Sequence, residues 1–195
     1  MNICVYGASS DAIDKAYIEA GERLGEEMAK RGHTLIFGGG AGGLMGAAAR
    51  GAARYGGKII GIAPSFFNVD GVLFDKCTEL IRTETMRERK QLLEDMSDAF
   101  IMSPGGIGTY EEFFEVLTLK QLDRHNKAIS ILNTNGYYTP MDRLLKETAK
   151  NGFMREASLK LYKMCDSVEE ILSYIEDYVP TEYDINDMKH LGRAN

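Results

Sequence analysis

The sequence Leu35-Ile36-Phe37-Gly38-Gly39-Gly40-Ala41-Gly42-Gly43-Leu44-Met45-Gly46 passes from a short apolar run, through a loop rich in glycine, into an alanine-rich segment. Glycine lets backbone N–H groups approach a ligand, and the first N–H groups of a helix are unpaired, so such a unit is suited to hold an anion. A tight turn beneath a helix is the alternative, but six glycines in nine positions are more than a turn requires. We therefore predict a strand over 34–37, a binding loop over 38–43 and a helix over 44–55.

The same alternation of strand and helix continues on both sides of this unit. Short apolar runs predict further strands over 2–6, 58–62, 99–102 and 127–132. These runs are nearly continuous in apolar residues, which is typical of strands covered on both faces. Helical periodicity predicts a helix that ends near Gly32 and further helices over 85–96, 109–122, 138–150 and 167–178, the last opened by a capping box of Ser167 and Glu170. The chain is therefore predicted to be an α/β protein, a Rossmann-like doubly wound parallel sheet with helices on both faces.

Length and composition narrow the possible functions. The 195 residues suit one domain, which we place at 1–178, followed by a polar C-terminal arm at 179–195. With 23 basic and 29 acidic residues the net charge is −6, which disfavours nucleic acid and membranes as partners. No run of about 18 apolar residues and no leader-like segment is found, so we expect a cytoplasmic protein. The three cysteines and three histidines are scattered, which predicts neither disulfides nor a metal site.

The glycine loop after the second predicted strand contains a G-x-G-x-x-G pattern formed by Gly38, Gly40 and Gly43. In dinucleotide-binding proteins this pattern follows the first strand, and an acidic residue at the end of the next strand binds the ribose. Here the pattern follows the second strand, and residues 58–63 end without Asp or Glu. A nicotinamide dinucleotide site is therefore disfavoured.

A second glycine loop, Ser103-Pro104-Gly105-Gly106-Ile107-Gly108-Thr109, follows the predicted strand 99–102. Thr109 is placed at the start of the next helix, where its hydroxyl and the first free N–H groups could hold a phosphate. Glu112 follows one helical turn later, and Thr109-x-x-Glu112 is also the pattern of a capping box. The other interpretation is that Glu112 has a functional role. A carboxylate beside a phosphate-binding loop is electrostatically unfavourable unless it takes part in the reaction.

Three cations, Arg87, Arg89 and Lys90, lie at the start of the predicted helix 85–96. Cations are mildly unfavourable there, because the helix dipole is positive at that end. Either they form a solvated charged face with neighbouring acidic residues, or an anion or an active-site carboxylate lies opposite them. Their spacing does not decide between these two interpretations.

Taken together, these segments resemble the LONELY GUY family. The shared motifs are Gly38-Gly39-Gly40…Gly43-Leu44-Met45-Gly46, Met86-x-x-Arg89-Lys90, Pro104-Gly105-Gly106-x-Gly108-Thr109-x-x-Glu112 and Leu132-Asn133-x-x-Gly136-Tyr137-Tyr138. Members of this family are cytokinin riboside 5′-monophosphate phosphoribohydrolases, often mislabelled lysine decarboxylases. The resemblance, which covers residues 1–178, implies a homodimer without metal or cofactor. It also implies that the substrate is an adenosine 5′-monophosphate, plain or N6-substituted, which is hydrolysed to the free base and ribose 5-phosphate.

The resemblance also implies a site. By motif position, Arg89 and Glu112 would be the catalytic pair, and the phosphate would lie on Gly105, Gly106, Gly108 and Thr109. The other substrate-binding residues would be Gly7, Ser9, Gly38, Gly39, Gly40, Gly43, Met86 and Lys90. The chain departs from the family pattern at Arg87, where many members have His, and at Ala128, where Pro is common. These departures leave the base preference and the assembly open.

The chemistry of such a reaction suits these residues. Breaking a C1′–N9 bond builds positive charge on the sugar, as in glycoside hydrolysis, and Glu112 could stabilise that charge and orient or deprotonate a water. Arg89 could fix Glu112, hold ribose hydroxyls or balance charge, and no dedicated acid for the leaving base is evident. Two alternatives remain. One is a nucleotide or molybdenum-cofactor-type carrier without turnover, and the other is a pyridoxal-phosphate decarboxylase, for which no lysine stands out.

Overall fold

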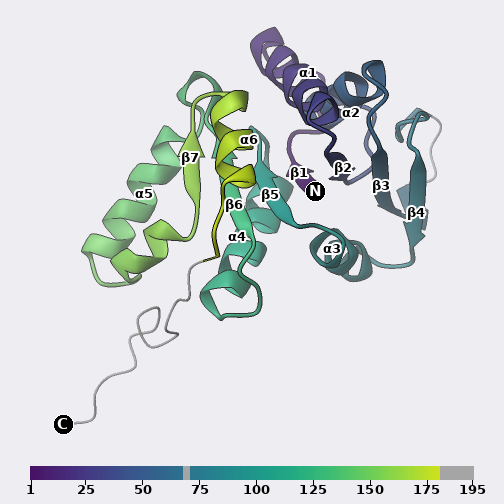
Figure 1. Cartoon of the computed structure of the whole chain (residues 1–195). Coiled ribbons are helices and arrows are strands. Elements are labelled where there is room, and N and C mark those ends of the chain that lie inside the picture. Colours follow the sequence, from purple (N-terminus) through teal and green to yellow (C-terminus); the bar gives the residue numbers. More distant parts are fainter. Residues whose placement is uncertain (68–70, 181–195) are drawn as a thin grey trace.

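The computed structural model describes residues 1–67 and 71–180, and in this part of the chain seven parallel strands form one sheet (Figure 1). The strands are β1 (Asn2–Tyr6), β2 (Thr34–Phe37), β3 (Ile59–Pro64), β4 (Glu79–Thr83), β5 (Ala99–Met102), β6 (Ala128–Leu132) and β7 (Lys163–Cys165). The α-helices are α1 (Lys15–Lys30), α2 (Gly43–Arg54), α3 (Met86–Asp95), α4 (Ile107–Gln121), α5 (Thr139–Lys150) and α6 (Val168–Glu176).

The order of the strands, β4-β3-β2-β1-β5-β6-β7, reverses at the centre of the sheet. The chain builds outward from β1 to β4 and then returns to place β5 on the other side of β1. In the register of these strands, Val5 lies opposite Phe37 of β2 and Ile101 of β5. At such a reversal the loops that leave the carboxyl ends of the strands diverge and leave space for a ligand. Here those loops follow Tyr6 and Met102.

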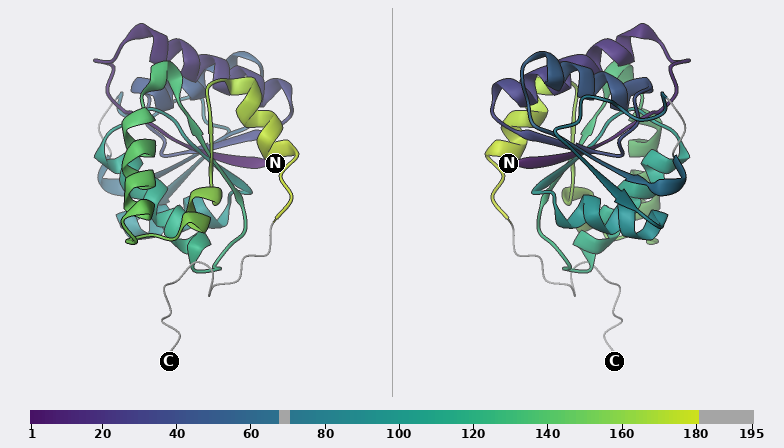
Figure 2. Two further views of the ribbon diagram at one scale, coloured as in Figure 1. Left: turned by 90° about the vertical axis from the view of Figure 1, so that its left-hand side faces the viewer. Right: turned by 90° about the vertical axis from the view of Figure 1, so that its right-hand side faces the viewer.

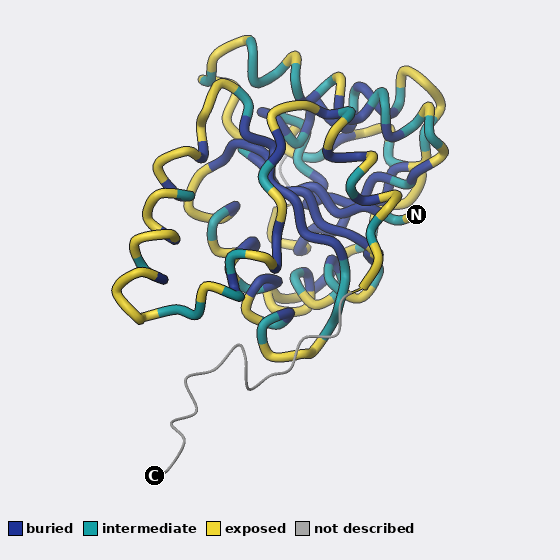
Figure 3. The backbone as a smooth tube through the Cα atoms, turned by 60° about the vertical axis from the view of Figure 1, so that its left-hand side comes forward, coloured by how far each residue is buried: buried dark blue, intermediate teal, exposed yellow. Residues whose placement is uncertain are grey.

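Helices cover both faces of the sheet, as Figure 2 shows. On one face, α1, α2 and α6 bury residues such as Leu24 and Ile171 in a cluster with the strands. On the other face, α3, α4 and α5 bury residues such as Leu93 and Phe113 in a second cluster. The buried residues concentrate in the strands between these layers (Figure 3). The prediction of an α/β fold with a doubly wound parallel sheet is confirmed.

The five predicted strands are present with bounds that differ by at most one residue at the start and two at the end, but β4 and β7 were not predicted. Both lie at the edges of the sheet. β4 carries Glu79 and Arg82 among its five residues, and β7 has three residues that begin with Lys163. Edge strands in natural proteins are commonly short and charged, which prevents pairing with other chains. These two strands therefore lack the apolar run on which the predictions depended.

The predicted capping box at the start of α6 is only half formed in the structure. The Ser167 hydroxyl accepts a hydrogen bond from the Glu170 N–H at 3.2 Å, but the Glu170 carboxylate accepts from the Asp166 N–H at 3.4 Å rather than from Ser167. Only the Ser167 half of that predicted box is formed. A complete capping box instead opens α3, where Thr85 and Glu88 bond reciprocally.

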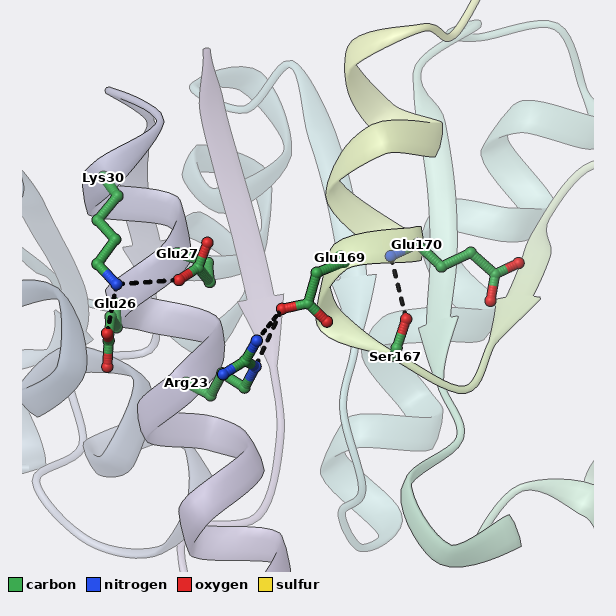
Figure 4. A network of polar contacts seen from close by, with 7 residues as sticks. All are labelled: Arg23, Glu26, Glu27, Lys30, Ser167, Glu169 and Glu170. Carbon is green, nitrogen blue, oxygen red and sulfur yellow. Dashed lines mark hydrogen bonds and ion pairs between the residues drawn. The ribbon is translucent and has the colours of Figure 1, made fainter.

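Close to Ser167, the start of α6 is joined to α1 by surface ion pairs (Figure 4). Arg23 of α1 pairs with Glu169 of α6, while Lys30 pairs within α1 with Glu26 at 2.5 Å and Glu27 at 3.1 Å. The side chains of Arg23, Glu169 and Lys30 are exposed and those of Glu26 and Glu27 are partly exposed, and ion pairs near the surface contribute about 0–1 kcal/mol each. The apolar contacts beneath them therefore dominate the packing of α6 on α1.

Two further observations concern the chain as a whole. None of the helices within 1–67 and 71–180 is long and apolar enough to cross a membrane. Of the predicted C-terminal arm at 179–195, residues 181–195 lie outside the described residues.

Candidate functional site

A cavity of about 780 Å³ lies at the carboxyl ends of the central strands. Its walls come from the loops after β1, β2 and β5, from the β3–β4 connection, and from the starts of α3 and α4. The lining residues are Gly7, Ala8, Ser9, Asp11, Gly38, Gly40, Ala41, Gly42, Met45, Phe67, Gly71, Val72, Leu73, Met86, Arg89, Gly106, Ile107, Gly108, Thr109 and Glu112. This volume is typical of a site for a small molecule.

A buried ion pair forms part of the cavity wall. Nη1 of Arg89, on α3, donates to Oε1 of Glu112, on α4, at 2.8 Å. Nε of Arg89 also donates to the Ile62 carbonyl of β3 at 3.2 Å, which fixes the guanidinium plane. The side chains of Arg89 and Glu112 are only 8% and 10% exposed, so water screens the pair poorly. Of the two interpretations left open for the cationic start of α3, a carboxylate lying opposite is the one that describes Arg89.

The electrostatics of Glu112 are set by two opposing effects. Burial raises the pKa of the Glu112 carboxyl above its ordinary value, and the adjacent Arg89 acts against this rise. Because burial is the larger effect, the carboxyl holds its proton to a higher pH than an exposed glutamate would. A glutamate of this kind is suited to acid–base or electrostatic work in a cavity.

The start of α4 offers unpaired N–H groups to the same cavity. Gly106 is the N-cap, no side chain caps the helix, and its first turn contains no acidic residue. A carbon atom added to Gly106 or Gly108 would meet no atom within 4 Å, so both present bare backbone to open space. Thr109 is the third residue of the helix rather than its start, which corrects the prediction. The capping-box alternative for Thr109 and Glu112 does not apply, because Gly106 is the N-cap and Glu112 pairs with Arg89.

The glycine loop after β2 has different surroundings. A carbon atom added to Gly38 would lie 2.2 Å from Nη2 of Arg89, so this glycine leaves room for the guanidinium. Gly43 has a φ of +59°, which favours glycine, and its N–H donates to Oδ1 of Asp11 at 2.7 Å. The loop is also bonded to the β3–β4 connection, since the Ala41 N–H donates to the Val72 carbonyl at 2.9 Å.

Most of the residues predicted for the site line the cavity, and four do not. Those that line it are Gly7, Ser9, Gly38, Gly40, Met86, Arg89, Gly106, Gly108, Thr109 and Glu112. The four that do not line it are Gly39, Gly43, Lys90 and Gly105. A carbon atom added to Gly105 would lie 2.2 Å from Oγ1 of Thr109, and the Gly105 carbonyl accepts from the Tyr137 hydroxyl at 2.8 Å. Gly105 therefore shapes the loop without facing the cavity.

Lys90 points away from the cavity, toward the outer side of α4. Its ammonium group pairs with Glu111 and, at 2.7 Å, with Glu115. These two glutamates stand on either side of Glu112 in the sequence, so Lys90 joins α3 to α4 beside the buried pair. Arg87 is exposed and lies outside this arrangement.

Several lining residues were not predicted. Asp11 lies in the loop after β1, and its position beyond a strand end is the signal that could have identified it. Phe67, Val72 and Leu73 come from the long β3–β4 connection, which carries no motif. Met45 belongs to the motif of the first glycine loop, but only glycines of that motif are assigned to the site from the sequence.

Within the described residues, no group of three or more His, Cys, Asp or Glu side chains could hold a metal ion. None of the lysines in this part of the chain lines the cavity. Sites that use pyridoxal phosphate bind it through a lysine Schiff base, and this cavity has no residue for that bond.

The chain matches a family model described as "Possible lysine decarboxylase" over residues 45–175. It is 34% identical over 183 residues to the cytokinin riboside 5′-monophosphate phosphoribohydrolase LOG of Oryza sativa subsp. japonica, a match that covers 94% of this chain and 75% of that protein. It is 38% identical over 175 residues to the cytokinin riboside 5′-monophosphate phosphoribohydrolase of Rhodococcoides fascians, covering 89% of this chain and 88% of that protein.

Solved structures resemble the chain over most of its length. The molybdenum cofactor binding protein from the phototrophic bacterium Rippkaea orientalis has a TM-score of 0.68 and 26% identity, covering 90% of this chain and 94% of that chain. The Moco carrier protein from Chlamydomonas reinhardtii has a TM-score of 0.67 and 22% identity over the same shares, which indicates a common fold.

Proposed function

Because this chain belongs to the family of the cytokinin riboside 5′-monophosphate phosphoribohydrolases, whose family model bears the description "Possible lysine decarboxylase", we propose that it hydrolyses the N-glycosidic bond of adenosine 5′-monophosphates. The products are the free base and ribose 5-phosphate. The observation that carries this proposal is the buried Arg89–Glu112 pair, which lies one helical turn from the unpaired N–H groups of α4 on the wall of one cavity.

The phosphate binds at the start of α4. The N–H groups around Gly106, Gly108 and Thr109 carry the positive end of the helix dipole, and no acidic residue in the first turn competes with an incoming anion. The open space before Gly106 and Gly108 lets phosphate oxygens come within hydrogen-bonding distance of the backbone. The binding energy of this non-reacting group holds the sugar in place for reaction.

Glu112 then lies beneath the sugar and acts on its anomeric carbon. As the C1′–N9 bond breaks, positive charge develops on the ribose, and the Glu112 carboxylate stabilises it. The same carboxylate orients or deprotonates the attacking water. Arg89 is fixed by the Ile62 carbonyl and by Glu112, so we assign it to holding the carboxylate in place and in its ionised form.

The base occupies the apolar part of the cavity. Met45, Phe67, Val72, Leu73 and Met86 line it, and these side chains suit a purine or an apolar N6 substituent. We propose that N6-substituted nucleotides and plain AMP are both substrates, and their relative rates define the base preference.

The decisive experiment follows release of the base from AMP and from N6-isopentenyl-AMP by chromatography. We expect product from at least one of them, and Glu112→Gln should lower kcat by about 10²- to 10⁴-fold. Glu111→Gln is the matched control, because Glu111 neighbours Glu112 but pairs with Lys90 outside the cavity. Folded wild-type protein that releases base from neither nucleotide would refute the proposed activity.

A carrier without turnover is the second candidate, and it is favoured by the similarity to the Rippkaea orientalis protein. A carrier would be stabilised against heat by a nucleotide or by a pterin-type cofactor without forming product. Glu112→Gln would then alter the melting temperature little, and neither the wild type nor the variant would form product.

We further propose that the enzyme is a cytoplasmic homodimer. Ile107 is 88% exposed beside the cavity, and Phe114 on the same face of α4 and Met86 at the start of α3 are also exposed. Apolar residues clustered at the surface commonly mark an interface. Cys4, Cys77 and Cys165 are free thiols, in keeping with a reducing compartment. Light scattering coupled to size exclusion would report the mass, and Ile107→Asp should yield monomers.

A further inference from the structure

Two helix N-termini reach the cavity from opposite faces of the sheet. α2 begins at Gly43 after the first glycine loop, and α4 begins at Ile107 after the second. The N-cap residue of both helices is a glycine, so no N-cap side chain accepts a hydrogen bond from the first N–H groups of either helix. Each would attract an anion, so a nucleotide could in principle place its phosphate at either one.

The N-terminus of α2 already holds an anion, which the protein itself supplies. Oδ1 of Asp11 accepts the hydrogen bond of the Gly43 N–H at 2.7 Å. Oδ2 of the same carboxylate lies beside Gly42, since a carbon atom added to that glycine would be 3.2 Å from it. Asp11 also lines the cavity, so its negative charge faces any ligand bound there.

The loop that carries Asp11 is in contact with both glycine loops. The Ala8 N–H donates to the Pro104 carbonyl at 3.0 Å, and the Ala8 carbonyl accepts from the Met45 N–H at 3.2 Å. Ala8 therefore bridges the start of α2 and the loop that leads into α4. Asp11 follows three residues further along this loop, and its side chain lines the same cavity as Gly106, Gly108 and Thr109 at the start of α4.

Among the described residues, the lining of the cavity offers no unpaired cation for a longer phosphate chain. Among the described residues that line it, the charged ones are Asp11, Arg89 and Glu112. Arg89 is already paired with Glu112 at 2.8 Å. A single phosphate finds backbone N–H groups at α4 and the hydroxyls of Ser9 and Thr109. A second phosphate would add negative charge to a cavity whose other charged lining residue, besides the Arg89–Glu112 pair, is the acidic Asp11.

We propose that Asp11 is a specificity-determining residue that restricts the site to nucleotides with one phosphate. It does so by occupying the N-terminus of α2 and by repelling additional phosphate charge. This proposal rests on the proposed function, because it concerns the substrate range of the same site. It also assigns different roles to the two glycine loops, since only the loop before α4 remains open to an anion.

The test compares release of adenine from AMP and from ADP by wild type and Asp11→Asn. Asparagine keeps an oxygen for the Gly43 N–H and removes the charge. We expect the ratio of kcat/KM for AMP over that for ADP to fall about tenfold or more, the size of one nearby charge–charge term. Asp14→Asn is the matched control, because Asp14 caps α1 through the Ala16 N–H at 2.8 Å and does not line the cavity. Its ratio should equal that of the wild type.

Binding provides an independent measurement that does not require turnover. In a Glu112→Gln background, calorimetry with AMP and with ADP should show that Asp11→Asn strengthens ADP binding relative to AMP. Wild type that binds AMP but releases no base would refute the proposed activity and leave the role of Asp11 to be judged from binding alone. An unchanged AMP:ADP ratio in rate and in binding, or an equal loss for both nucleotides, would overturn the proposal. If Asp11→Asn does not fold, Asp11→Ser removes the same negative charge and leaves a shorter side chain at the N-terminus of α2.

Discussion

Gly38 and Gly108 both contribute bare backbone to the cavity, but a methyl group added at each position would meet different surroundings. At Gly38 the added carbon would lie 2.2 Å from Nη2 of Arg89, whereas at Gly108 it would meet no atom within 4 Å. Gly38 is therefore required by a neighbouring side chain of the protein, and Gly108 leaves space for a ligand. Two loops of similar composition thus contribute to one site for different physical reasons.

Among the changes that test this comparison, the largest effect is expected from Arg89→Gln, which removes the group that Gly38 accommodates. Without the guanidinium, the burial that raises the pKa of Glu112 loses its main opposition, so the pKa of this carboxyl rises further. A raised pKa means that the carboxylate is protonated at higher pH, so the acid limb of the kcat profile should move to higher pH. We expect kcat near neutral pH to fall by about 10²-fold or more.

The measurement for this variant is kcat against pH, beside the wild type. A loss of kcat by the same factor at every pH would mean that Arg89 acts on the substrate directly rather than by maintaining the charge of Glu112.

Gly38→Ala comes next, because its methyl group displaces the guanidinium from Glu112. We expect kcat to fall by up to about 10²-fold, as small displacements in a reactive site can cause, with a loss of about 1–3 kcal/mol in stability. Gly40→Ala is the matched control, since its added carbon would meet only the Met45 methyl group, at 3.4 Å.

A double-mutant cycle sharpens this prediction. In an Arg89→Gln background, Gly38→Ala should cost little further activity, because the shorter, uncharged side chain leaves room for the methyl group. Additive losses in the cycle would show that Gly38 serves the site by some means other than making room for Arg89.

How much of this arrangement the sequence predicts depends on the signal each part carries. The inner strands are predictable because burial on both faces makes them continuous apolar runs, whereas the edge strands β4 and β7 contain Glu79, Arg82 and Lys163. The motifs identified Arg89 and Glu112, but they could not separate Arg89 from Lys90. Adjacent helical residues point about 100° apart, and which one faces the cavity depends on how α3 packs against α4.

Residues outside the motifs could not be assigned from sequence. Asp11 has no partner within its own loop, and its significance comes from the Gly43 N–H, which is distant in sequence. Phe67 and Val72 reach the cavity through a connection whose path is set by tertiary bonds such as that between Ala41 and Val72. Such contacts are decided by the assembled fold.

Gly108→Ala should have a smaller effect and of a different kind. Gly108 is the second residue of α4, where alanine favours the helix by about 0.5–1 kcal/mol, and the added carbon has open space. Stability should therefore rise slightly. The KM for AMP should increase about threefold to tenfold, the effect of one weakened hydrogen bond to the phosphate. Thermal melting without ligand and steady-state kinetics would measure the two effects separately. A fall in stability would contradict the view that this glycine leaves space for a ligand.

The smallest effect is expected from Tyr137→Phe, which tests whether the second loop needs outside support. The Tyr137 hydroxyl donates to the Gly105 carbonyl at 2.8 Å, and Tyr137 is 37% exposed, so water can replace the lost bond. We expect a cost of about 0.5 kcal/mol and little change in KM. Tyr138→Phe is the matched comparison, because the fully buried Tyr138 hydroxyl donates to the Ser103 carbonyl at 2.7 Å. Water cannot reach that carbonyl as easily, so the cost there should be about 1–3 kcal/mol. If Tyr137→Phe instead raised KM by tenfold with unchanged stability, the open conformation of the second loop would depend on this one hydroxyl. The difference between the two glycine loops would then come from the side chains that hold them in place rather than from their glycines.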